Sequence, residues 1–132
     1  MDLAKFDTRT NSNAGIDFEL NDLRTGKGSG AFIRILGSDS DTFQRLKTER
    51  SRAIAKRLEE SGAEQLTSEE IDDMTAVMLA SCTVGWSNID QPGGKEPLAF
   101  STAAAKKLYL DYPAIRDQIN RAVGDRSNFL LA

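Results

Sequence analysis

Two neighbouring segments near the N-terminus carry the strand signal that most limits the possible folds of this chain. Ile16, Phe18 and Leu20 alternate with polar residues, and this period of two predicts a half-buried β-strand. A glycine-rich turn follows, and residues 31–36 then form a second run rich in strand-forming side chains, so residues 15–37 predict a β-hairpin. Because two strands alone are only marginally stable in water, this hairpin requires helices or another subunit against its apolar face.

The first helix predicted after the hairpin covers residues 42–61. Its large apolar residues recur at helical spacing along one stripe, in which Arg50 fills a gap, and Gly62 ends the helix. The stripe consists of Phe43, Leu46, Ile54 and Leu58. Such a helix can pack one side against the rest of the protein while its other sides remain in water.

The second predicted helix has the clearest terminal signal in the chain. Thr67 and Glu70 form a capping box, and Leu66 and Ile71 flank it as a hydrophobic staple. The apolar face then continues to Cys82, which we expect to be a buried small apolar residue, and the helix should end near residue 85.

Two shorter helices are predicted in the C-terminal part. Ser101 caps one that runs to about residue 112, and Pro113 begins another that runs to residue 124. We therefore expect a mostly helical α+β protein in which a β-hairpin precedes about four helices. In this prediction residues 1–14 are a flexible N-terminal arm and residues 15–132 are a single domain, with helices within 40–124 and an apolar C-terminal tail at 125–132.

The composition removes several classes of function. The chain has 132 residues, one cysteine, no histidine and a net charge of −3. Catalysis that depends on histidine and the commonest zinc sites are thereby excluded, and we expect no enzyme activity, no cofactor and no metal. No apolar run is long enough to cross a membrane and no signal peptide is visible, so we expect a cytoplasmic protein.

Charge is distributed unevenly between the first two predicted helices. Residues 45–57 hold six basic side chains, and residues 59–73 hold seven acidic ones. A basic helix can bind nucleic acid, but the adjacent acidic block repels phosphates, so a solvated helix face is favoured. A third interpretation is that opposite charges on successive helices let identical subunits pair head to tail. The charged candidates for this self-association are Arg45, Arg50, Arg52, Glu69, Asp72 and Asp73.

Apolar residues in the last third of the chain are further candidates for contacts. Trp86, the only tryptophan, is interpreted as a core residue in preference to an interface anchor. Phe129 and Leu130 either dock against the same chain or are offered to a partner. If a partner holds them, their substitution by alanine should weaken binding more than it weakens the fold.

The last third of the chain contains four short motifs, namely Val84-Gly85-Trp86-Ser87-Asn88-Ile89, Pro97-Leu98-Ala99-Phe100-Ser101, Ala104-Ala105-Lys106-Lys107-Leu108 and the closing Asn128-Phe129-Leu130. Through these motifs, residues 77–131 resemble the tail assembly chaperones of long-tailed bacteriophages. Such proteins have no enzymatic activity and no firmly transferable active-site residues. The resemblance therefore assigns only fold or contact roles, to Trp86, Phe100 and Phe129.

The resemblance also implies the partners. Tail assembly chaperones bind the tape measure protein, keep its hydrophobic helices from aggregating, recruit the tail tube protein and self-associate. We therefore expect a homo-oligomer in the cytoplasm of the bacterial host. Two alternatives remain, namely a small nucleic-acid-binding or regulatory protein that uses the basic helix at 45–57, and a minor structural tail protein.

Overall fold

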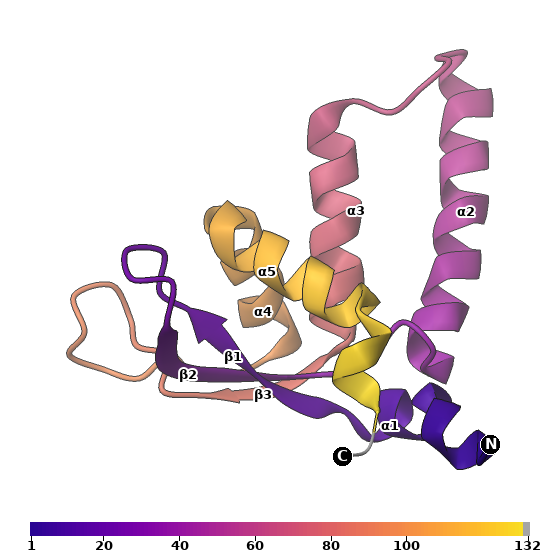
Figure 1. Ribbon diagram of the computed structural model, residues 1–132. Coiled ribbons are helices and arrows are strands. Elements are labelled where there is room, and N and C mark those ends of the chain that lie inside the picture. The colour runs from indigo at the N-terminus through magenta and orange to yellow at the C-terminus, as the bar shows by residue number, and fades with distance from the viewer. Residues whose placement is uncertain (131–132) are drawn as a thin grey trace.

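The computed structural model describes residues 1–130 and has the α+β, mostly helical architecture that the sequence predicts (Figure 1). The elements in chain order are η1 (Leu3–Phe6), α1 (Thr8–Ala14), β1 (Ile16–Asn21), β2 (Gly28–Ile35), α2 (Asp41–Ser61), α3 (Ser68–Ser81), β3 (Thr83–Ser87), α4 (Thr102–Asp111), α5 (Pro113–Gly124) and η2 (Arg126–Phe129), where η denotes a 3₁₀ helix.

The sheet has three antiparallel strands in the order β1-β2-β3, one strand more than the sequence predicts. Phe18 lies opposite Ile33, and Ile33 lies opposite Trp86 of the additional strand. The sequence predicts that residues 83–87 form the end of a helix and a connection, and that prediction is wrong. The strand is only five residues long, contains a glycine and is irregular opposite β2, so alternation alone does not reveal it.

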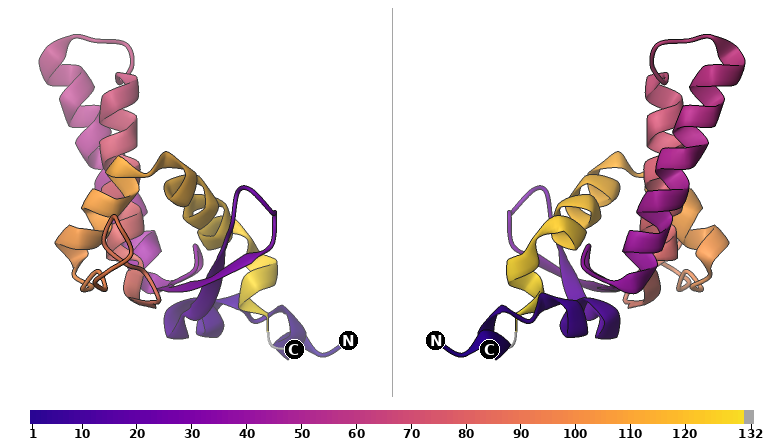
Figure 2. Two further views of the ribbon diagram at one scale, coloured as in Figure 1. Left: turned by 90° about the vertical axis from the view of Figure 1, so that its left-hand side faces the viewer. Right: turned by 90° about the vertical axis from the view of Figure 1, so that its right-hand side faces the viewer.

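One face of the sheet is covered by α3, α4 and α5, and the hydrophobic core lies between this face and the three helices (Figures 1 and 2). Ile33 and Ile35 of β2 are completely buried, as is Tyr109 of α4. The Tyr109 hydroxyl lies 2.7 Å from Oγ1 of Thr83, which itself donates a hydrogen bond to the Leu79 carbonyl. The apolar spacing of α5 is confirmed, because Ile119 and Val123 are both buried.

The N-terminal segment is folded, which corrects the prediction of a flexible arm over residues 1–14. Asp7 caps α1, and Ser12 of this helix is buried. The Gly37 N–H donates to the Ser12 carbonyl at 3.1 Å. A Cβ atom on Gly37 would lie 2.3 Å from the Ser12 hydroxyl, so only glycine permits this close approach. Polar composition suggested an arm because none of these long-range contacts is visible in the local sequence.

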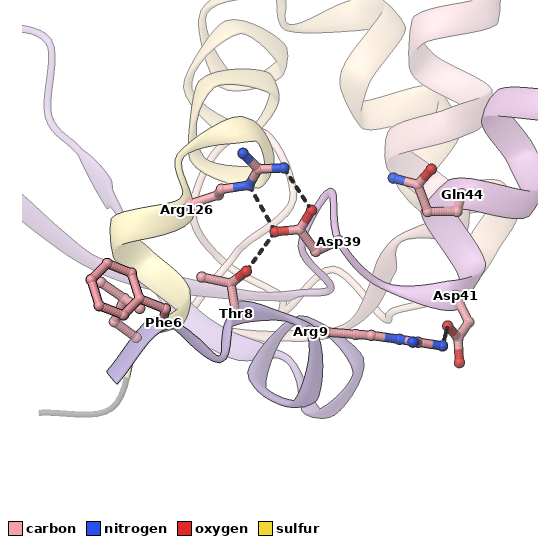
Figure 3. A pocket seen from close by; sticks show the side chains of 8 residues that line it. Phe6, Thr8, Arg9, Asp39, Asp41, Gln44 and Arg126 are labelled. Carbon is pink, nitrogen blue, oxygen red and sulfur yellow. Dashed lines mark hydrogen bonds and ion pairs between the residues drawn. The ribbon is translucent and has the colours of Figure 1, made fainter. Parts of the chain in front are cut away.

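Asp39 joins three segments that are distant in the sequence (Figure 3). Its carboxylate accepts hydrogen bonds from Nε and Nη2 of Arg126 at 2.8 and 3.0 Å, and from the Thr8 hydroxyl at 2.6 Å. The Arg126 guanidinium, followed by the Thr8 hydroxyl, holds the pKa of Asp39 below its ordinary value. One carboxylate therefore links α1, the β2–α2 loop and η2.

We expect Asp39→Ala to lower the free energy of unfolding by about 1 kcal/mol at pH 7, because a bidentate pair and a hydroxyl bond are lost. Since the folded-state pKa is lowered, this stabilisation is present above the carboxyl pKa of the unfolded chain and disappears as pH falls through the folded-state pKa. Urea titrations at pH 7 and at pH 3 measure both effects. Arg9→Ala removes an ion pair that is exposed on both sides, and it should change stability by less than about 0.5 kcal/mol.

Helices α2 and α3 lie side by side and project from the rest of the molecule, and we call this pair the arm (Figures 1 and 2). Ser40 caps α2, Gly62 ends it in a left-handed conformation, and the predicted capping box of Thr67 and Glu70 begins α3. The α2 helix has 21 residues, and none of them is fully buried. Capping residues thus define the helix ends of the arm, but the sides of α2 are only partly buried by the rest of the protein.

Candidate functional site

The arm carries an apolar groove between its two helices. Leu46 and Ala53 line it from α2, and Met74 and Val77 line it from α3, around a volume of about 210 Å³. Val77 is 41% exposed, and Ile71 nearby is 44% exposed. Exposed apolar side chains gathered along a projecting pair of helices are typical of a binding surface.

Charged residues connect the two helices beside the groove. Nε of Arg57 lies 2.9 Å from a carboxylate oxygen of Glu70, which itself completes the capping box. Nη1 of Arg50 lies 4.0 Å from the sulfur of Met78, so its apolar stem fills the predicted gap in the α2 stripe. These two arginines therefore serve the contact between α2 and α3.

The acidic candidates on α3 are largely committed within the same chain. Asp72 pairs with Arg116 of α5 at 3.8 Å, and Asp73 pairs with Lys106 of α4 at 3.4 Å. Both carboxylates fasten α3 to the helices beside it, which the separation in sequence conceals. They are therefore poor candidates for a pairing surface between subunits.

The remaining charged candidates are exposed. Arg45 pairs only with Glu49 one turn along α2, at 3.9 Å. Arg52 and Glu69 form no ion pair within residues 1–130. Of the six charged residues selected from the sequence, the exposed surface thus retains Arg45, Arg52 and Glu69 as available groups.

Trp86 and Phe100 form one aromatic corner at the edge of the core. Their ring centroids are 5.0 Å apart with the planes nearly perpendicular, and the Trp86 indole N–H donates to the Leu98 carbonyl at 2.7 Å. Trp86 is partly buried against the core, as the sequence favoured. The corner fixes the long β3–α4 connection onto the sheet.

Phe129 and Leu130, near the C-terminal end, have opposite environments. Phe129 is 1% exposed and belongs to the core, whereas Leu130 is 44% exposed. Phe129 is therefore wrong as a candidate for partner contact, because its ring is already enclosed by the same chain. The rest of the predicted apolar tail, residues 131–132, lies outside the described residues.

A wide depression lies where the two ends of the chain meet (Figure 3). It has a volume of about 700 Å³ and is lined by Phe6 and Leu130 together with the Asp39–Arg126 pair. The carboxylate and guanidinium at its centre are bonded to each other. This depression therefore offers no free charged group at its centre for a ligand.

Residues 1–130 contain no cluster of three or more metal-ligating side chains. Within the same residues, no helix combines the length and the apolarity needed to span a bilayer. Cys82 is buried, as predicted, and burial raises the pKa of its thiol to about 11.

We expect the stability of the protein to fall as pH rises from about 9 to about 12. Burial raises the pKa of the Cys82 thiol to about 11 and that of the Tyr109 hydroxyl to about 12, so the folded state retains protons that the unfolded chain releases. The stabilisation is fully present below the unfolded-state pKa values and is lost as pH passes the folded-state values. Urea titrations across this range measure it, and Cys82→Ala should reduce the slope.

Comparison of the chain with protein families, with curated protein sequences and with solved structures gives no match.

The sequence did not identify the groove as a site. In the sequence, Leu46 belongs to the apolar stripe of the first predicted helix and Met74 to the apolar face of the second, so neither residue marks a groove. Ala53 drew no attention because a small residue has no chemical signature. The available signal was that the stripe on α2 is narrow for a helix of its length.

Proposed function

We propose that this protein is a non-catalytic tail assembly chaperone of a long-tailed bacteriophage or prophage. In this role it binds the tape measure protein, cooperates with the tail tube protein and self-associates in the cytoplasm of the bacterial host. The proposal combines the resemblance of residues 77–131 with one structural observation, namely the projecting arm with its exposed apolar groove. The resemblance supplies the partners, and the groove supplies a surface suited to binding.

The physical demands of the role fit this surface. A long helical client exposes apolar residues along its length, and it can be kept soluble by many weak contacts made by neighbouring copies of a small protein. Each contact needs apolar area that is accessible in the folded chaperone. Met74 and Val77 provide such area without strained or reactive groups, and a methionine side chain adapts to varied partners.

Co-expression with the tape measure protein of the same phage tests the proposal. We expect the tape measure protein to remain soluble and to purify with this chain, and to aggregate when this chain is omitted. A tape measure protein that is equally insoluble with and without it would contradict the proposal.

The nucleic-acid alternative predicts a different result. A protein that binds through basic residues 45–57 should shift DNA or RNA in a gel, with an affinity that falls steeply as salt rises. In the structure Arg50 and Arg57 serve the contact with α3, which leaves fewer basic groups on one exposed surface. We therefore expect no salt-sensitive shift.

The alternative of a minor structural tail protein differs from a chaperone in where the protein is found after assembly. A minor tail protein remains in the finished virion, whereas a chaperone leaves before completion. Mass spectrometry of purified particles should therefore detect tail tube and tape measure proteins but not this chain.

A further inference from the structure

The arm has apolar surface that no further helix in the described part of the chain covers. Two antiparallel helices cover one stripe of each other, and further helices normally cover the remaining apolar surface. Here α2 has no fully buried residue, and the groove beside it exposes Leu46, Ala53 and Val77. Nothing within residues 1–130 covers the groove.

Charge varies systematically along the arm. Residues 41–52 of α2, near the body of the protein, contain four basic and two acidic side chains, and Asp72 and Asp73 of α3 are paired with Arg116 and Lys106 of the body. Residues 56–70, which form the far end, contain two basic and five acidic side chains. The far end of the arm is therefore negative and the part of α2 near the body is positive.

We propose that a second copy of this chain covers the groove when no client occupies it, with the two arms packed antiparallel about a two-fold axis. This arrangement places the acidic far end of each arm beside the basic part of the other, twice in the same interface. A parallel arrangement would place the two acidic ends together, where they repel. The inference deepens the self-association in the proposed function by naming the surface and the orientation.

The arm has suitable dimensions for such a contact. The 21-residue helix α2 is about 30 Å long and the 14-residue helix α3 about 20 Å, so side by side they present a face of about 500 Å². This is about two-thirds of the roughly 800 Å² that each partner buries in a protein interface of standard size. In a two-fold interface a contact between two different positions occurs twice, so each favourable charge pair is doubled.

The groove is tested by a matched pair of substitutions on α2. Ala53→Arg places a long charged side chain in the groove, whereas Ala55→Arg introduces the same residue two positions along the helix, away from it. Sedimentation velocity over a range of protein concentrations should give self-association at least about tenfold weaker for Ala53→Arg and unchanged for Ala55→Arg. Circular dichroism checks that both variants remain folded.

The orientation is tested by reversing charges at each end of the arm. One variant carries Arg45→Glu with Arg52→Glu, and the other carries Glu59→Lys with Glu64→Lys. Each variant alone should self-associate at least about tenfold more weakly than the unaltered chain at low salt, because like charges then face and repel each other in the interface. Mixing the two should restore association as a heterodimer, because each end again meets its opposite.

Several outcomes would overturn the inference. These are a monomeric unaltered chain at high concentration, equal association of the Ala53 and Ala55 variants, or charge variants that associate as well as the unaltered chain or are not restored by mixing. If the unaltered chain associates but the groove and charge variants do so equally well, the inference fails while the chaperone role stands. If the pairing is found but the tape measure protein is not kept soluble, the role fails and the pairing stands.

Discussion

Phe129→Ala should lower the free energy of unfolding by about 3–5 kcal/mol, a large effect for a single substitution. The ring is almost completely buried, and it packs among core residues of the sheet and helices. A Cβ atom added to Gly37 would lie 3.0 Å from it, so the loop after β2 passes directly over the ring. Alanine would leave a cavity that the surrounding backbone cannot easily close. Urea or guanidinium titration followed by circular dichroism measures the loss.

Leu130→Ala is the matched control, because it removes a neighbouring apolar side chain that is about half exposed. We expect it to change stability by less than about 1 kcal/mol. If Phe129→Ala leaves stability unchanged and instead abolishes self-association or client binding, the position is a contact residue and its enclosure in the core is wrong. The pair of variants thus separates a structural role from a binding role at the end of the chain.

Trp86→Ala should also have a large effect, about 3 kcal/mol. The substitution removes the edge contact with Phe100 and the hydrogen bond to the Leu98 carbonyl, and it exposes the core beside β3. Because Trp86 is partly buried, the expected loss lies at the lower end of the range for large aromatic residues. Circular dichroism is the appropriate probe, since the variant contains no tryptophan for fluorescence.

Two further variants separate the contribution of the indole hydrogen bond from that of the contact between the two rings. Trp86→Phe keeps an aromatic ring but loses the indole N–H, and it should cost about 1 kcal/mol. Phe100→Ala removes only the half-exposed partner ring and should cost about 1 kcal/mol as well. A stable Trp86→Ala protein that no longer self-associates would make the corner an interface and would contradict its structural role.

These expectations change the meaning of the resemblance. Trp86, Phe100 and Phe129 carry much of it, and all three help to build the core or its edge. They therefore support the fold, and binding must depend on other surfaces. The proposed function then leads to the arm, which lies outside most of the resembling segment and presents the exposed apolar groove.

Local signals in the sequence determined the individual elements. Alternation at Ile16, Phe18 and Leu20 gave β1, the Thr67–Glu70 capping box gave the start of α3, and Pro113 gave the start of α5. Each of these signals acts over a few residues, through side-chain alternation, capping hydrogen bonds or a fixed backbone angle. That is why the α+β class and most helix boundaries could be predicted.

Only the tertiary structure decided which surfaces remain available. The strand at residues 83–87 exists because β2 lies beside it, and α1 is held because Gly37 and Asp39 reach back to it across the chain. Asp72 and Asp73 appeared free in the sequence, yet their partners Arg116 and Lys106 are far along the chain. Ion pairs, enclosure of a ring such as Phe129 and exposure of a groove all depend on residues distant in sequence, and short-range patterns carry no information about them.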